Sequence, residues 1–203
     1  IETNFETMKH LYDKTNGCLV VRPYHYETTL IFGCGNQDIG DYTEHTHRGC
    51  YTVDIDPFQK SSVIGNIEKS DLSFIRNESF HLIMSEGGGP TLTVKVFREL
   101  IRLLSSENGI LTWDLFNPMI DSYQHTLLCS SYNGVYTVNC DFGSSVIKLK
   151  WLHGKLMMFH QPDQIPKHLV SLYCNEHYKP ASDEELEKLF RFMLAEPKRC
   201  KTT

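Results

Sequence analysis

Residues 29–40 read TLIFGCGNQDIG, and this stretch decides the fold that we expect for the chain. An apolar run, Leu30 to Phe32, meets two glycines at Gly33 and Gly35. A short apolar run that stops at glycine is typical of a buried strand, because glycine permits a sharp exit that a side chain would block. Glycines also let the backbone approach a ligand closely, and a helix that begins there would offer free N–H groups to it. The same pattern fits the plain end of a strand, so the rest of the chain must decide between the two interpretations.

Further strands are predicted on both sides of one amphipathic helix. Apolar or β-branched runs bounded by glycine, proline or polar residues predict strands at 50–54, 61–67, 80–85 and 110–116. Leu92, Val96, Leu100 and Leu103 share one face of a predicted helix over 91–106. This order predicts an α/β fold with a mostly parallel sheet and helices on both of its faces.

The second half of the chain has a less regular pattern. We interpret 119–131 as a helix, and 135–142 with 146–153 as an antiparallel hairpin at the edge of the sheet. Other short strands are predicted at 156–160 and 169–174, and helices at 4–15 and 182–194. We expect a single domain over 1–203, with an N-terminal helix and lead-in (1–28), a core sheet (29–160) and a C-terminal extension with a helix (161–203).

The composition limits the classes of partner. The 203 residues are 40% hydrophobic and 22% charged, with a formal net charge of −5. A negative net charge argues against nucleic acid held by bulk electrostatics. Lys148, Lys150 and Lys155 fall close together, and we interpret them as one solvated strand face in preference to a basic binding patch. No run approaches the roughly 18 apolar residues of a membrane span, so no membrane partner is expected.

The cysteines predict a reducing, cytoplasmic environment. There are seven, an odd number, and none forms a CxxC pair. In a chain large enough to build its own core, this usage is typical of reduced thiols inside a cell. Cys174 and His177 have a spacing that could hold a metal, but no second pair of ligands has matching spacing, so no metal site is predicted.

Polar side chains follow several of the predicted strands at the point where each strand ends. Asp54 ends the second strand, 19 residues after Gly35, and Asn66 with Ile67 ends the third. Ser85 and Glu86 end the fourth. Because the carboxyl ends of parallel strands meet at one edge of a sheet, these residues are expected to converge on a nucleoside-type ligand.

This arrangement resembles the class I S-adenosylmethionine-dependent methyltransferases. The resemblance covers residues 28–116 and, more loosely, the hairpin at 135–160. The glycine-rich turn after the family's first strand corresponds to Ile31-Phe32-Gly33-Cys34-Gly35-Asn36-Gln37, and the acid after its second strand to Asp54 in YTVDIDP. The family's FDLI-like fourth strand is matched by residues 80–83, FHLI.

The resemblance implies a Rossmann-like methyltransferase fold and methyl transfer from S-adenosylmethionine to a small-molecule or protein acceptor. It places the cofactor against the turn and the strand ends, on Gly33, Cys34, Gly35, Asn36, Asp54, Ile55, Asn66, Ile67 and Ser85. Asp54 would bind the ribose hydroxyls, and Asn66 and Ile67 would hold the adenine. Glu86 is the candidate catalytic base where the acceptor must lose a proton, with capping of the glycine loop 87–89 as its alternative role.

Three positions depart from the family pattern and leave an alternative open. Ile31, Gln37 and Asn66 replace an acid, a glycine and an acid, so a catalytically inactive binding or interaction domain is the alternative function. A dinucleotide-binding enzyme is disfavoured, because its G-x-G-x-x-G turn requires glycine where this chain has Asp38. The acceptor and the oligomeric state are not set by the sequence.

Overall fold

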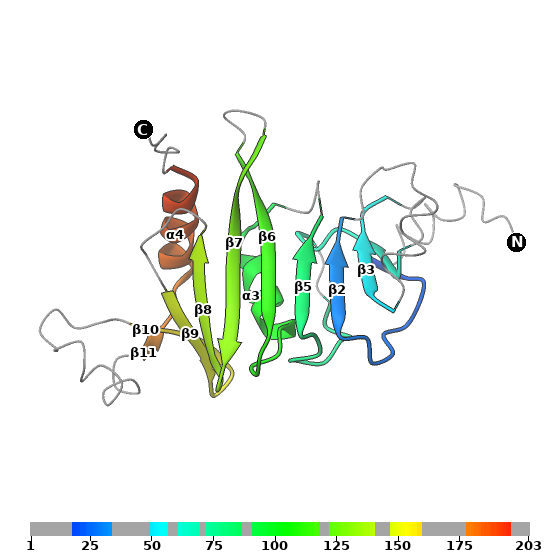
Figure 1. Ribbon diagram of the computed structural model, residues 1–203, viewed down its shortest axis with the longest axis horizontal. Coiled ribbons are helices and arrows are strands. Elements are labelled where there is room, and N and C mark those ends of the chain that lie inside the picture. The colour runs from blue at the N-terminus through cyan, green and yellow to red at the C-terminus, as the bar shows by residue number, and fades with distance from the viewer. Residues whose placement is uncertain are drawn as a thin grey trace, which may run out of the picture.

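The structure is a computed structural model that describes residues 18–33, 49–56, 61–69, 72–86, 91–117, 122–140, 147–159 and 178–195. These residues build one mixed sheet of 11 strands in the order β1-β4-β3-β2-β5-β6-β7-β8-β9-β10-β11 (Figure 1). The helix predicted at 4–15 and the strand predicted at 169–174 lie outside the described residues.

The parallel part of the sheet contains the strands that the apolar runs predicted. It consists of β2 (Thr29–Phe32), β3 (Tyr51–Asp54), β4 (Val63–Gly65), β5 (Leu82–Ser85) and β6 (Ile110–Asn117). β2 lies between β3 and β5, with β4 outside β3 and β6 outside β5. Every residue of β3 and β4 is buried, as expected of parallel strands that are covered on both faces. These strand predictions are confirmed.

The antiparallel part of the sheet continues from β6. It consists of β7 (Ser122–Tyr132), β8 (Val135–Cys140), β9 (Ile147–Leu152), β10 (Lys155–Phe159) and β11 (Tyr178–Pro180), while β1 (Cys18–Val20) pairs with β4 at the other edge. The predicted hairpin at 135–153 and the strand at 156–160 are confirmed as β8, β9 and β10. Buried residues alternate with exposed or half-buried ones along β10, so one side of this strand is more open to solvent than the other.

The helix predicted at 119–131 is wrong, because β7 occupies most of it. Leu127, Cys129 and Ser131 are buried, whereas Leu128 and Ser130 between them are exposed, which is the two-residue period of a strand. Only residues 118–121 separate β6 from β7, and a parallel neighbour would need a crossover of about a dozen residues or more. The chain therefore returns antiparallel, and six of the ten strand pairings in the described sheet are antiparallel.

The two helices that the structure describes begin at well-defined caps. α3 (Val94–Leu103) begins after Thr93, whose side chain accepts a hydrogen bond from the N–H of Val96. α4 (Asp183–Ala195) begins with a capping box, in which Ser182 Oγ accepts from the Glu185 N–H and the Glu185 carboxylate accepts from the Ser182 N–H. Both helices were predicted from their apolar faces and are confirmed.

Both described helices pack on the same face of the sheet, which we call the helix face. The rings of Phe97 in α3 and Phe190 in α4 lie 5.2 Å apart, and Arg98 of α3 forms an ion pair with Asp183 of α4. Their apolar side chains join one core cluster with alternate residues of the strands, among them Phe32, Ile83, Leu111, Trp113, Val138 and Leu149. The sheet residues between these alternate positions lie on the opposite face.

The predicted fold class, a Rossmann-like α/β methyltransferase fold with helices on both faces of a mostly parallel sheet, is therefore wrong. The described chain is a large mixed sheet with its two helices side by side on one face. The physical reason lies after β6, where short hairpins replace the crossover helices that a parallel sheet needs. Asn133-Gly134 and His153-Gly154 make two of these hairpin turns, with positive φ at all four residues.

Candidate functional site

The candidate site is the carboxyl edge of the parallel strands, which we define by Gly33, Asp54, Asn66 and Glu86. The chain runs from β2 through β3 to β4 on one side, and then places β5 and β6 on the other side of β2. The direction of strand succession therefore reverses between β2 and β5, and ligands of open sheets bind outside the strand ends at such a point. The arrowheads of β2, β3 and β5 end at this edge in Figure 1.

Gly33 follows the last residue of β2 and is the last described residue before 49. Its φ is 68°, in the left-handed region that favours glycine. Its N–H donates to the carbonyl of Val53 at 3.0 Å, and the N–H of Glu86 donates to the carbonyl of Phe32 at 2.9 Å. These two bonds hold the end of β2 between β3 and β5. Cys34, Gly35 and Asn36, the rest of the predicted turn, lie outside the described residues, as do Gln37 and Asp38.

Asp54 ends β3 next to this turn. Its side chain is buried, and Oδ1 accepts a hydrogen bond from the N–H of Asp56 at 2.8 Å. This local bond fixes the orientation of the carboxylate and turns the chain out of the strand. Ile55, the next residue, is 59% exposed, which is high for a large apolar side chain beside a strand end. The structure therefore brings a fixed carboxylate and an exposed apolar side chain together beside Gly33.

Asn66 and Ile67 follow β4, but both are engaged by the chain itself. The Asn66 amide oxygen accepts from the N–H of Glu68 at 3.0 Å, which closes a turn of the same type as that at Asp54. Ile67 is buried and belongs to the core cluster. Neither arrangement resembles a surface left open for adenine, and their roles as cofactor contacts stay predictions.

Ser85 and Glu86 end β5 on different faces. Ser85 lies on the helix face, where its Oγ accepts from the N–H of Asp114 at 2.9 Å, and the rings of Phe32 and Trp113 meet on that face. Glu86, the candidate base, is half-buried, and the alternation of the strand turns it toward the opposite face. Its catalytic role stays a prediction.

Asp114 is a residue of this edge that the sequence reasoning missed. It lies on β6, half-buried, and its Oδ1 accepts from the hydroxyl of Thr126 on β7 at 3.1 Å. Strand alternation places it on the same face as Glu86. The sequence contained a signal for this residue, because Asp114 is the single acid in the apolar strand ILTWDLF. An acid in such a strand needs a polar partner or a function.

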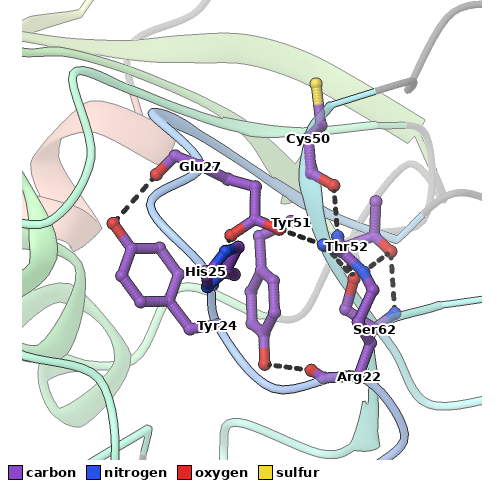
Figure 2. A network of polar contacts seen from close by, with 8 residues as sticks. All are labelled: Arg22, Tyr24, His25, Glu27, Cys50, Tyr51, Thr52 and Ser62. Atoms are coloured by element: carbon purple, nitrogen blue, oxygen red, sulfur yellow. Dashed lines mark hydrogen bonds and ion pairs between the residues drawn. The ribbon is translucent and has the colours of Figure 1, made fainter.

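The opposite end of the parallel strands carries a polar network that the sequence analysis also missed (Figure 2). Arg22 contacts Glu27 as an ion pair, and it donates to the carbonyl of Cys50 at 2.7 Å and to Ser62 Oγ at 2.8 Å. The hydroxyl of Tyr51 donates to the carbonyl of Arg22 at 2.8 Å. The network ties the lead-in segment before β2 to the beginnings of β3 and β4.

Two pKa shifts follow from this network. Burial works against ionisation of Glu27, but hydrogen bonds from the backbone and the Arg22 side chain outweigh it, so the pKa of this carboxyl is lowered. Burial raises the pKa of the Tyr51 hydroxyl to about 12. Tyr24 is partly buried and packs edge-on against Tyr51 and Phe80 at the margin of the core cluster. We therefore assign the network a structural role.

The described residues contain neither a metal-ligand cluster nor a membrane-spanning helix. No group of three or more His, Cys, Asp or Glu side chains among them is arranged to hold a metal ion. Cys174 and His177 lie outside the described residues. Neither of the described helices combines the length and the apolar character needed to cross a membrane. Comparison with protein-family models, curated proteins and solved structures found no match to this chain.

Proposed function

We propose that the carboxyl edge binds S-adenosylmethionine and that the protein transfers its methyl group to a small-molecule or protein acceptor. The observation that carries the proposal is the pairing of Gly33, in a left-handed turn after β2, with the fixed carboxylate of Asp54 at the end of the adjacent parallel strand. A carboxylate at this place can accept hydrogen bonds from the two ribose hydroxyls of an adenosyl group. The proposal rests on this strand-end chemistry and not on the fold class.

Methyl transfer requires mainly that the protein align the acceptor with the sulfonium methyl group. The acceptor attacks the sulfonium methyl in line, the new bond to the methyl carbon forms as the carbon–sulfur bond breaks, and S-adenosylhomocysteine leaves with the electron pair. Alignment and exclusion of water supply most of the acceleration. Glu86 takes a proton where the acceptor carries one to lose, and its half-buried position at the same edge supports that role.

A cytoplasmic location goes with this proposal. Cys50 and Cys129 are not in disulfides, which supports a reducing compartment.

The alternative, a binding domain without turnover, is favoured by a different observation. Asn66, Ile67 and Ser85 are predicted cofactor contacts, yet each is engaged inside the chain. A site that lacks these contacts would hold the cofactor weakly or accept another ligand.

Calorimetric titration with S-adenosylmethionine and S-adenosylhomocysteine tests the proposal. Asp54→Asn is the decisive variant, because the amide oxygen can still accept from the Asp56 N–H while the charge is lost. We expect micromolar binding to the unchanged protein, weakened about tenfold or more in Asp54→Asn, which corresponds to ~1.4 kcal/mol. Asp183→Asn, in an exposed ion pair far from the edge, is the matched control and should bind normally.

Three results would each contradict a part of this proposal. Absence of saturable binding to both ligands removes the cofactor site, and equal weakening in Asp54→Asn and Asp183→Asn removes the role of Asp54. Tight binding without methyl transfer to any acceptor in a cell extract supplied with labelled cofactor would favour the inactive domain.

A further inference from the structure

The antiparallel part of the sheet carries three lysines on the face opposite the helices. Lys148 and Lys150 lie on β9 and Lys155 on β10, and we call this surface the lysine face. The register pairs Lys150 with Met157 and Leu152 with Lys155, so the three side chains leave the sheet on one side. The residues between them, Leu149 and Leu156, are buried in the core cluster on the helix face.

Two of the three lysines, Lys148 and Lys155, have no acidic partner among the described residues. Strands β7 to β10 contain no aspartate or glutamate. Lys148 and Lys155 are exposed, and no ion pair joins either of them to another described residue. Lys150 lies over the ring of Tyr178 with Nζ 4.2 Å from its centroid, which holds this ammonium at the sheet surface.

This local charge contrasts with the charge of the whole chain. The chain has 25 acidic and 20 basic residues, so an acidic molecule is repelled at long range and attracted at this face.

Apolar side chains accompany the lysines: Leu128 is 41% and Leu152 40% exposed on the same side of the sheet. A positive face of this kind steers an oppositely charged partner, and the two leucines add apolar contact area beside the charges.

We propose that the lysine face docks an acidic segment of a partner protein that also carries apolar side chains. The lysines attract its carboxylates, while Leu128 and Leu152 contact its apolar side chains. This surface lies on a different part of the sheet from the carboxyl edge, and the inference is independent of methyl transfer.

Single-stranded nucleic acid fits this surface less well. Such ligands stack their bases on exposed aromatic rings. Tyr178 is only 8% exposed and has Lys150 over its ring. Among the residues of β7 to β10 whose side chains the structure describes, Tyr132 is the one largely exposed aromatic residue. Tyr132, 68% exposed, stands alone at a hairpin turn, so a row of bases would lack a stacking platform.

The test is fluorescence anisotropy of the full chain with three labelled probes: a peptide of alternating glutamate and leucine, a peptide of alternating lysine and leucine, and an oligouridylate. The double variant Lys148→Glu/Lys155→Glu reverses the two unpaired charges, and Lys148→Gln/Lys155→Gln removes them. Lys95→Glu is the control, because Lys95 is exposed on α3 on the other face of the sheet. Circular dichroism and the melting temperature establish that each variant is folded.

We expect saturable binding of the glutamate–leucine peptide alone, weakened by salt. Affinity should fall about tenfold or more in the Glu double variant, by less in the Gln double variant, and remain unchanged in Lys95→Glu. Equal loss in Lys95→Glu, or absence of saturable binding of the acidic peptide, overturns the proposal. Preferential binding of oligouridylate that is lost in the Glu double variant also overturns it, and assigns the face to nucleic acid.

Discussion

Replacing Arg22 by methionine should loosen the lead-in segment from the sheet. Methionine keeps much of the apolar stem but removes the donors that reach the Cys50 carbonyl at 2.7 Å and Ser62 Oγ at 2.8 Å. A hydrogen bond from a charged donor contributes about 1.5–3 kcal/mol, so the two bonds together are worth at least ~3 kcal/mol before hydration is considered. The Arg22 side chain is 46% exposed, and water replaces part of that loss. We therefore expect the free energy of unfolding to fall by about 2 kcal/mol.

Urea unfolding followed by circular dichroism measures this effect. The midpoint should fall at an unchanged m-value, because the surface exposed on unfolding is nearly the same. Arg191→Met is the matched control: Arg191 is 78% exposed in an ion pair with Glu187, and its loss should cost about 0.5 kcal/mol or less. A loss in Arg22→Met no larger than that of the control would refute the structural role of the network.

The pH dependence of the same network provides a second measurement. Because the pKa of Glu27 is lower in the folded chain than its ordinary value of 4.5, its stabilising effect is complete above that value. It is lost as the pH falls through the lower folded pKa. Glu27→Gln cannot titrate, so its unfolding free energy should fall less between about pH 6 and about pH 3 than that of the unchanged protein. Parallel curves for the two proteins would contradict this assignment.

Two further predictions concern the junction of α3 with the sheet and the core. A Cβ at Gly109 would lie 2.5 Å from the carbonyl oxygen of Ser105 and 2.9 Å from Ser131 Oγ. Gly109→Ala should therefore lower the free energy of unfolding by about 2 kcal/mol, which thermal unfolding measures. An unchanged melting temperature would contradict the tight packing at this position. Burial raises the pKa of the Cys129 thiol to about 12. This thiol should therefore react with a maleimide only as fast as the protein unfolds, and more slowly than the thiols of Cys18 and Cys50. Equal reaction rates for the three thiols would contradict the burial of Cys129.

The predictable part of the site lies at the ends of the central strands. The apolar run before Gly33 and the β-branched run before Asp54 predicted adjacent buried strands, because their local patterns suffice for strands covered on both faces. The positive φ of Gly33 agrees with the expectation that glycine permits the exit from this strand. Asp114 was not predicted, because its place beside Glu86 depends on the pairing of β5 with β6 and not on any spacing along the chain.

The sequence by itself determined which segments form the parallel strands β2 to β6, where α3 and α4 lie, and that glycine ends β2, but it did not predict β1. Each of these follows from local periodicity, caps or backbone freedom, which neighbouring residues along the chain decide. Tertiary structure alone decided that β7 is a strand, because pairing with β6 and β8 prevailed over a weak helical pattern. It also decided that Ile67 and Ser85 face the core and that the two described helices share one face, which depends on contacts between residues far apart in the sequence.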